Sequence, residues 1–304
     1  MTVEVFTTHR KLLAGVAYRI LGSAADAEDV VQEAWLRWAE VDAASVADPK
    51  AYLVRVTTNL AIDRLRRVRA RREAYIGPWL PEPVVDPPGS GEPAELADSV
   101  ELALLVVLET LSPLERAVFV LREAFGFSHG EIAEILGRGE PAVRQLARRA
   151  RDHVRERRPR FDVDRRTRRT ITERFVAACA EGDIEGLTAL LAADVRMVSD
   201  GGGKVRAPLR ELAGAVPVAR FLLAITSAEG RRRFLASLGA SPDGEMRAEI
   251  ADVNGGPAIV ARLDGRPITV ISLVIADGLV DTIYLIANPD KMSRMEARNA
   301  SASA

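Results

Sequence analysis

Apolar residues recur at helical spacing through most of the first 158 residues. From Asp26 to Trp38 they fall three or four positions apart, which leaves the acidic and amide side chains together on another face. A second helix is expected from Pro49 to Glu73, because proline is well tolerated in a first helical turn. We therefore expect a helical domain from Phe6 to Arg72.

A helix-turn-helix is predicted in residues 127–158. Ser128 followed by Glu131 is a capping box, in which each side chain bonds a backbone N–H that the helix start leaves unpaired. Gly137 then ends the first of the two helices. Apolar helices expected in residues 100–125 complete a compact four-helix module.

The second helix of this motif has two chemically different faces. One is apolar at helical spacing and should face a core. The other carries a row of arginines beside Gln145, and arginine both binds guanine bidentately and pairs with phosphates. This arrangement is typical of a helix that lies in a DNA groove, although an ordinary solvated basic face is the alternative. The two sets are Val143, Leu146, Ala147, Ala150 and Val154, and Arg144, Arg148, Arg151 and Arg155.

The periodicity changes after residue 165. Helices are expected at 167–181, 184–191 and 216–226, and after them the pattern indicates strands separated by turn signals such as Asn-Gly and Asp-Gly. Helices followed by an antiparallel meander predict an α+β domain. The expected strands are residues 231–240, 245–254, 257–265, 266–276 and 278–287.

Charge is strongly segregated although the formal net charge of the 304-residue chain is only -1. Lys and Arg are absent from Glu73 through Glu115, and arginine clusters lie on both sides. The single cysteine excludes an internal disulfide, and no histidine follows His153, so we expect no metal or cofactor. There is no signal pattern and no apolar run long enough for a membrane span, which predicts a cytoplasmic protein.

Each of the first two predicted helices has a distinctive charge. The acidic face of residues 26–38 suits a basic protein partner, or is simply solvated. The end of the next helix is densely basic, and we expect that its arginines cannot all find intramolecular carboxylates, which would favour phosphate contact. These arginines are Arg64, Arg66, Arg67, Arg69, Arg71 and Arg72.

The order of DAEDVVQEAWLRW, NLAIDRLRR, a spacer and an arginine-rich helix-turn-helix resembles regions 2 and 4 of bacterial extracytoplasmic-function (ECF) sigma factors. The resemblance implies two all-α modules that bind core RNA polymerase and promoter DNA. It places Asp29, Gln32 and Glu33 against polymerase. It assigns the minus-ten element to Asn59, Asp63, Arg64, Arg66 and Arg67. It assigns the minus-thirty-five element to Arg144, Gln145, Arg148 and Arg149.

The spacer carries the string WLPEP, and Trp79 and Leu80 are costly apolar residues to leave in a solvated linker. WLPEP resembles the linker of a sigma subgroup that has a fused SnoaL-like domain, a cone-shaped branch of the NTF2-like fold. AEGDIEGLTALLAADV, DGGGK and NPDK resemble the same subgroup. The expected organisation is residues 1–75 (region 2), 76–99 (linker), 100–158 (region 4), 165–291 (SnoaL-like domain) and 292–304 (flexible tail).

We hypothesise that DGGGK and NPDK lie near one another and contact the sigma modules or the linker. Deleting the chain after Ala287 is then expected to change transcription without unfolding the protein. The expected regulatory residues are Trp79, Leu80, Pro81, Glu82, Pro83, Asp200, Gly201, Gly202, Gly203, Lys204, Asn288, Pro289, Asp290 and Lys291.

Relatives of the cone fold include isomerases, which need a general base. The carboxylates Asp194, Asp200 and Asp281 lie next to turns or at strand ends, so we expect no enzyme. The resulting prediction is a sigma factor, monomeric when free, whose fused domain regulates it. The alternative is a one-component DNA-binding regulator whose C-terminal cavity binds a small ligand. Whether the fused domain activates or inhibits, and whether its cavity holds a ligand, stay open.

Overall fold

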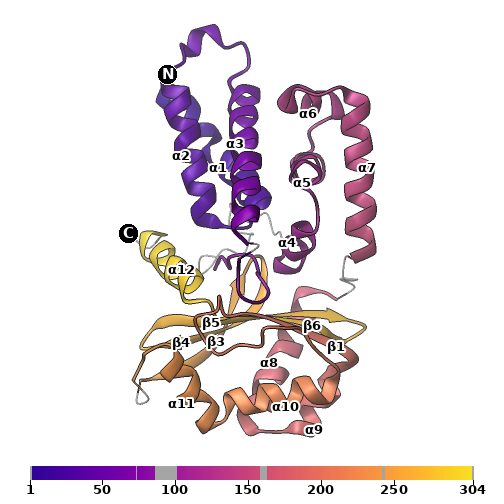
Figure 1. Cartoon of the computed structure of the whole chain (residues 1–304), viewed down its shortest axis with the longest axis vertical. Helices are drawn as coiled ribbons and strands as arrows, with labels where there is room; N and C mark the ends of the chain where they lie inside the picture. The colour runs from indigo at the N-terminus through magenta and orange to yellow at the C-terminus, as the bar shows by residue number, and fades with distance from the viewer. Residues whose placement is uncertain (1, 73, 86–100, 158–162, 242–243, 303–304) are drawn as a thin grey trace. The chain divides into compact units, whose positions relative to one another are not determined.

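The computed structural model describes residues 2–72, 74–85, 101–157, 163–241 and 244–302, which form two compact units (Figure 1). The first unit contains 2–72 and 104–157, and the second contains the rest. Residues 86–99 of the predicted linker, and residues 158–162 at the predicted boundary between region 4 and the SnoaL-like domain, lie outside the described part. Among the described residues no helix is both long and apolar enough to cross a membrane.

The first unit begins with three helices that pack on one another. Trp38 lies at the centre of their interface, fully buried, and its indole Nε1 donates to the Thr2 carbonyl at 2.9 Å. The helical domain is therefore confirmed. The helices are α1 (Thr2–Leu21), α2 (Ala24–Ala39) and α3 (Pro49–Arg72), with a short 3-10 turn at Ala43–Ser45.

The rest of the first unit is the predicted helix-turn-helix with its supporting helices. The Ser128 side chain accepts from the Glu131 amide at 3.2 Å, and the Glu131 carboxylate accepts from the Ser128 amide at 2.7 Å. The five apolar residues predicted for the core face of the second helix are all buried. The elements are α4 (Leu102–Glu109), α5 (Pro113–Phe119), a π-helical turn (Val120–Ala124), α6 (His129–Leu136) and α7 (Glu140–Arg157).

The second unit is a six-stranded mixed sheet with helices, in the strand order β2-β1-β6-β5-β4-β3. Strands β3 to β6 form the predicted antiparallel meander, whereas β1 pairs with β6 in parallel. The strands are β1 (Leu191–Asp200), β2 (Leu212–Ala213), β3 (Met246–Val253), β4 (Gly256–Leu263), β5 (Arg266–Ala276) and β6 (Leu279–Ile286).

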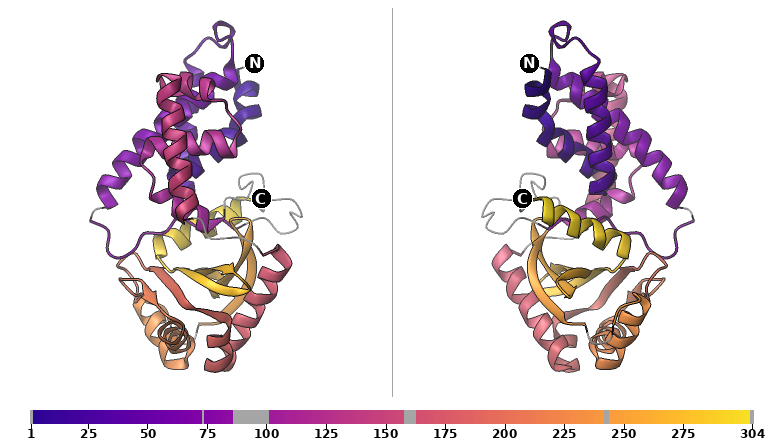
Figure 2. Two further views of the ribbon diagram at one scale, coloured as in Figure 1. Left: turned by 90° about the vertical axis from the view of Figure 1, so that its right-hand side faces the viewer. Right: turned by 90° about the vertical axis from the view of Figure 1, so that its left-hand side faces the viewer.

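Helices cover both faces of this sheet (Figures 1 and 2). Phe175, Leu187, Val218 and Leu222 pack with strand residues such as Ile283 into one buried core. One helix, α12, lies on the opposite face and contacts β5. The helices are α8 (Arg165–Glu181), α9 (Ile184–Leu190), α10 (Ala215–Thr226), α11 (Ala228–Ser237) and α12 (Pro289–Ala302).

The predicted hairpin turns are confirmed by their backbone angles. Asn254, Asp264 and Asp277 have φ of 53°, 50° and 51°, and each is followed by a glycine that also has a positive φ. Two successive positive φ values define the turn whose twist matches paired strands. These turns set the register of the meander.

Three elements differ from the sequence prediction. Residues 231–240 were expected as a strand but lie mostly in α11, which Ser227 caps by accepting from the Gly230 amide at 3.0 Å. Leu191 was assigned to a helix, but it opens β1, an unpredicted strand. The expected flexible tail after Lys291 is instead helix α12, which buries Met292 and Met295.

We predict opposite effects for two glycines of the helix-turn-helix. Gly137 has a φ of 61° with open space around it, so Gly137→Ala should lower stability by about 1 kcal/mol through backbone strain alone. Gly130 lies in α6 with ordinary helical angles, and Gly130→Ala should raise stability by up to about 1 kcal/mol. Urea unfolding of both variants tests this, and a loss of stability in both would contradict it.

Candidate functional site

The acidic face of α2 is exposed to solvent. Asp29, Gln32 and Glu33 all lie on it, and the exposed fractions of the Asp29 and Glu33 side chains are 62% and 48%. Leu36 follows on the same face and is 58% exposed. An apolar side chain beside carboxylates is common in protein interfaces. Sequence reasoning missed Leu36, because a leucine in an amphipathic helix is normally assigned to the core.

The predicted minus-ten residues lie along α3, and most have partners inside the first unit. Asp63 binds Arg66 at 3.0 Å and accepts from Arg67 Nε through its backbone carbonyl at 3.3 Å. Asn59 Nδ2 donates to the Ile135 carbonyl in α6 at 3.3 Å, so α3 and α6 are in direct contact.

Arg64 is held by two carboxylates of α2. Its Nε and Nη2 donate to Asp26 Oδ1 at 2.9 and 2.6 Å, and Nη2 also donates to Asp29 Oδ2 at 3.0 Å. The hydrogen bonds to Asp26 are the main cause of a raised pKa of Arg64, and the charges of both carboxylates add to it. Together they outweigh partial burial, which alone would lower the pKa. A residue expected at DNA therefore contacts a residue expected at polymerase.

Glu109 of α4 is the centre of a buried ion-pair network. Arg72 Nη1 pairs with Glu109 Oε2 at 2.5 Å, Arg116 Nη1 pairs with the other oxygen, and Arg69 Nη2 donates to the Glu109 carbonyl at 3.0 Å. Arg116 is fully buried and its Nε donates to the Arg19 carbonyl at 2.9 Å. The network joins α1 and α3 to α4 and α5.

Carboxylates pair with some of the arginines at the end of α3. We expected that these arginines could not all find intramolecular carboxylates; Arg66 and Arg72 each pair with one and Arg64 pairs with two, whereas Arg67 and Arg69 donate to backbone carbonyls. The partners of Arg64 and Arg72 are distant in sequence and become neighbours only through packing. The number of arginines available for phosphate contact on this helix is correspondingly smaller.

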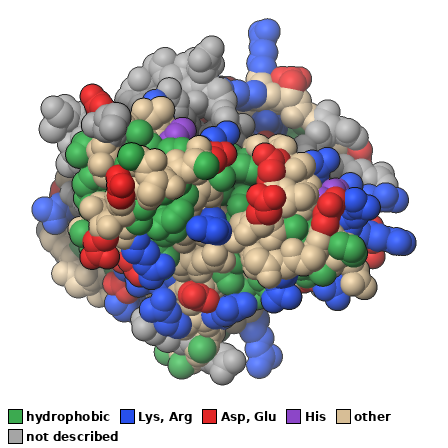
Figure 3. Space-filling model, turned by 90° about the horizontal axis from the view of Figure 1, so that it is seen from above, with side chains coloured by type: hydrophobic (Ala, Val, Ile, Leu, Met, Phe, Trp, Pro, Cys, Tyr) green, Lys and Arg blue, Asp and Glu red, His purple; other side chains and the backbone are tan. Residues whose placement is uncertain are grey.

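The predicted recognition helix α7 keeps its basic face exposed. Arg144, Arg148 and Arg149 are 64%, 83% and 57% exposed, and Gln145 is exposed beside them. Their partners Glu140, Asp152 and Glu115 are carboxylates of the same module, at 2.5, 3.8 and 3.3 Å. Figure 3 shows Lys and Arg side chains gathered on the right-hand edge, the side of α7 in Figure 1.

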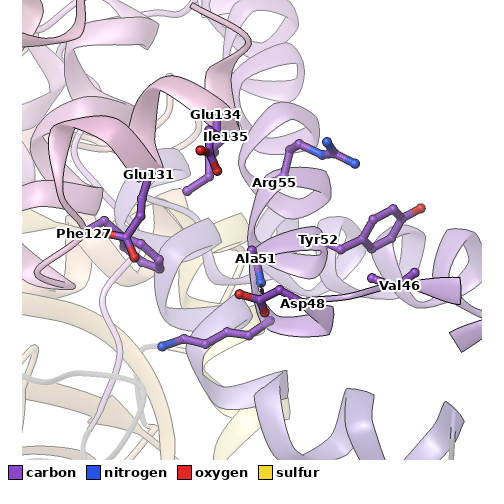
Figure 4. A pocket seen from close by; sticks show the side chains of 10 residues that line it. Val46, Asp48, Ala51, Tyr52, Arg55, Phe127, Glu131, Glu134 and Ile135 are labelled. Carbon is purple, nitrogen blue, oxygen red and sulfur yellow. Dashed lines mark hydrogen bonds between the residues drawn. The ribbon is translucent and has the colours of Figure 1, made fainter. Parts of the chain in front are cut away.

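A groove with a volume of about 350 Å³ separates the start of α3 from α6 (Figure 4). Its charged lining includes Lys50 and Arg55 from α3 and Glu131 and Glu134 from α6. Lys50 lies 5.7 Å from the centre of the Phe127 ring. The groove is mixed in charge, so it does not by itself indicate a ligand class.

In the second unit, the carboxylate of Asp200 is fully buried at the end of β1. It accepts from the Tyr75 hydroxyl at 2.5 Å, the Leu80 amide at 2.9 Å and Lys291 Nζ at 2.5 Å. The Gly202 amide adds a fourth hydrogen bond at 3.1 Å. Tyr75 and Leu80 belong to the segment that follows α3, so this carboxylate holds that segment to the α+β domain.

Lys291 binds the same segment from α12. Its Nζ also donates to the Leu80 carbonyl and lies 4.2 Å from the centre of the Trp79 ring, a cation–π distance. Asn288 Nδ2 donates to the Tyr75 hydroxyl at 2.8 Å. Burial, followed by the hydrogen bond to Asp200, raises the pKa of Tyr75 above its ordinary value of 10.0, so the phenol stays a donor.

The glycines of DGGGK allow this close packing. A Cβ atom on Gly202 would lie 2.6 Å from the Asn288 side chain, and one on Gly203 would lie 2.9 Å from Ile76. Farther along, the Val84 amide donates to Asn254 Oδ1 at 3.1 Å, and the Val84 carbonyl accepts from the Asn254 amide at 2.8 Å. We call residues 75–85 in this arrangement the docked linker.

The other predicted regulatory residues take different positions. Leu80, Pro81, Glu82 and Pro83 are buried. Lys204 points to solvent, where it pairs with Asp290 at 2.7 Å. Pro289 is the first residue of α12, and Gly201 turns the chain after Asp200. Sequence reasoning missed Tyr75. The available signal was that it is an aromatic residue at the start of a spacer expected to be solvated.

Comparisons with known proteins agree with both modules of the first unit. Residues 5–72 match Sigma-70 region 2, and residues 101–154 match Sigma-70 region 4. Over 300 residues the chain is 39% identical to the ECF RNA polymerase sigma factor SigJ of Mycobacterium tuberculosis, covering 96% of this chain and 94% of that protein. The chain belongs to the ECF RNA polymerase sigma factors.

The likeness of this sigma factor to its relatives extends through the α+β domain. The crystal structure of Mycobacterium tuberculosis SigJ matches with a TM-score of 0.75 and 36% identity, covering 96% of this chain and 98% of that one. A probable ECF sigma factor, SigI of the same species, is 31% identical over 295 residues. The alternative of a one-component regulator fails because it leaves the region 2 module unexplained.

The Glu109 network yields a stability prediction. Glu109→Gln leaves Arg116 buried without a counter-charge and should lower stability by about 3–5 kcal/mol, whereas Glu140→Gln removes only an exposed pair and should change it by less than about 1 kcal/mol. Denaturant unfolding of both variants tests this. Equal, small losses would contradict a buried network.

The same pair predicts a pH dependence. Burial alone would raise the pKa of Glu109, but Arg116 and Arg72 outweigh it and hold the pKa below its ordinary value of 4.5. Because the folded-state pKa is depressed, this stabilisation is present above about pH 4.5 and is lost as the pH falls through the folded-state value. Acid unfolding of the wild type should therefore be steeper than that of Glu109→Gln.

The docked linker gives a third prediction. Lys291→Met leaves the Asp200 carboxylate buried without its cation, so the linker should detach and proteases should cut it many-fold faster. Lys204→Met removes a pair whose members are 52% and 56% exposed and should leave the cleavage rate unchanged. Limited proteolysis with mass-spectrometric mapping reads both outcomes.

Proposed function

We propose that this sigma factor binds core RNA polymerase through α2 and directs promoter-specific initiation from the cytoplasm. The main support is an exposed surface on α2 that has both charge and apolar area, formed by Asp29, Gln32, Glu33 and Leu36. Among the described residues, Gln32 has no hydrogen-bond partner and Leu36 has no contact with the core. Basic side chains on the polymerase would pair with the two carboxylates.

On the DNA side, Arg144, Gln145, Arg148 and Arg149 read the upstream element from the major groove. Their exposure and the capped geometry of the helix-turn-helix support this assignment. Asn59, Asp63, Arg64, Arg66 and Arg67 handle the downstream element. Arg67 is the best placed of this set for phosphate contact, because it is exposed and its Nε donates to a neutral backbone carbonyl.

The two DNA-binding elements must separate before both can be used. The upstream and downstream elements are about 25 base pairs apart, which is roughly 85 Å of duplex. Asn59 contacts α6, which packs against α7, and each helix is only about 10–12 Å across. We propose that the structure represents the free, closed protein and that polymerase holds the two modules apart.

The α+β domain regulates this opening through the docked linker. Support comes from the Asp200–Lys291 pair, which holds the segment that leaves the end of α3. The domain is not an enzyme in this proposal, because Asp200, the buried candidate base, already binds Tyr75, Leu80 and Lys291. Deleting the chain after Ala287 is an unsuitable test, since it would remove the buried Met292 and Met295.

Transcription with purified core RNA polymerase tests the proposal. Genomic fragments should yield discrete start sites only when the full-length protein is added, and Arg148→Ala should reduce that output at least tenfold. Binding to DNA fragments without initiation would contradict the proposal and favour a DNA-binding regulator.

The regulatory part has its own test in the same assay. Lys291→Met should change the output from a selected promoter several-fold relative to wild type, because it releases the linker, whereas Lys204→Met should not. Identical output from Lys291→Met and wild type would rule out regulation through the docked linker.

A further inference from the structure

Arg64 lies at the junction of two predicted surfaces. It projects from α3, the proposed minus-ten helix, and binds Asp26 and Asp29 of α2, the proposed polymerase-binding helix. One guanidinium and two carboxylates carry a summed charge of -1, one positive against two negative. A phosphate approaching Arg64 would meet a net negative group, and phosphate contact is disfavoured in this state.

The two carboxylates hold Arg64 unequally. Asp26 accepts two of the three hydrogen bonds, at 2.9 and 2.6 Å, and its side chain is only 20% exposed. Asp29 accepts one, at 3.0 Å, and is 62% exposed. Asp29 is therefore the carboxylate that an external cation can reach, while Asp26 is well placed to keep the guanidinium oriented.

From this geometry, and resting on the proposed function, we infer that Asp26 is a positioning residue for Arg64 and that Asp29 is an electrostatic brake that polymerase releases. A polymerase cation that pairs with Asp29 removes one negative charge from the group. The remaining Asp26–Arg64 pair is neutral, and the Nη2 N–H that Asp29 had accepted becomes available to a phosphate. Polymerase binding and minus-ten binding are thereby coupled through one arginine.

The coupling is reciprocal. If polymerase at Asp29 strengthens DNA binding at Arg64, DNA at Arg64 must strengthen polymerase binding at Asp29 by the same factor. No movement of either helix is required, because the change is in charge and in the sharing of one guanidinium.

The brake is tested without polymerase, on the full-length protein. Asp29→Asn imitates the released state, so binding to a short forked duplex with a mixed-sequence single-stranded arm should tighten several-fold. Its dependence on salt concentration should steepen by about one counterion. Arg64→Gln should abolish the gain, and Asp29→Asn combined with Arg64→Gln should bind no tighter than Arg64→Gln alone.

Two matched variants separate the brake from simpler explanations. Glu40→Gln makes the same charge change at the other end of α2, where it should leave affinity unchanged. Asp26→Asn also removes one charge from the group but releases the orientation of Arg64, so it should give no gain. Equal gains in Asp29→Asn and Glu40→Gln would reduce the effect to net charge. Equal gains in Asp29→Asn and Asp26→Asn would overturn the positioning role.

Failure of this inference is distinct from failure of the proposed function. If the wild type initiates transcription but Asp29→Asn leaves DNA affinity unchanged, the brake is wrong and the sigma function stands. If the variants follow the expected pattern but core polymerase does not alter DNA affinity, Asp29 is not the contact that polymerase uses. Asp29→Asn and Glu40→Gln change exposed side chains, so both variants should unfold at a denaturant midpoint close to that of the wild type.

Discussion

The second unit depends on one buried ion pair, Asp200 with Lys291. Removing a carboxylate and an ammonium from water is strongly unfavourable unless their remaining hydrogen-bonding sites are filled. Here the docked linker fills them: Tyr75 and the Leu80 amide donate to the carboxylate, and the Leu80 carbonyl and the Trp79 ring receive the ammonium. The buried ion pair of the α+β domain therefore has all of these hydrogen-bond partners only when the segment after α3 is in place.

A similar logic organises the first unit. Glu109 pairs with Arg72 and Arg116, and the carboxylates of α2 pair with Arg64, so part of the positive charge at the end of α3 is already paired within the unit. The exposed arginines of α7 form only surface ion pairs, which contribute little to stability and can be replaced by contacts to DNA at low cost. In the proposed closed state, several side chains of the proposed minus-ten helix α3 are thus paired internally while the basic face of α7 is exposed.

Local patterns were sufficient to predict the elements that have local causes. The capping box at Ser128 and Glu131 and the Asn254, Asp264 and Asp277 turns follow from residues a few positions apart. The strand prediction for residues 231–240 was wrong because Phe234 and Leu235 fit either a strand or a helix. Only the N-cap Ser227 distinguishes the two. The partners of Arg64, Arg72 and Asp200 are far away in sequence, so no local pattern could supply them. Motif resemblance suggested that WLPEP, DGGGK and NPDK act together, but only packing shows which atoms meet.

The central claim is that the fused α+β domain binds the linker in the free sigma factor. Hydrogen exchange at residues 79–85 tests this claim most directly. The Leu80 and Val84 amides donate to Asp200 and Asn254 side chains, so in the wild type they should exchange far more slowly than an unstructured peptide of the same sequence. Lys291→Met should abolish this protection while leaving that of α7 unchanged. Linker amides that exchange at the unstructured rate in the wild-type protein would contradict the account.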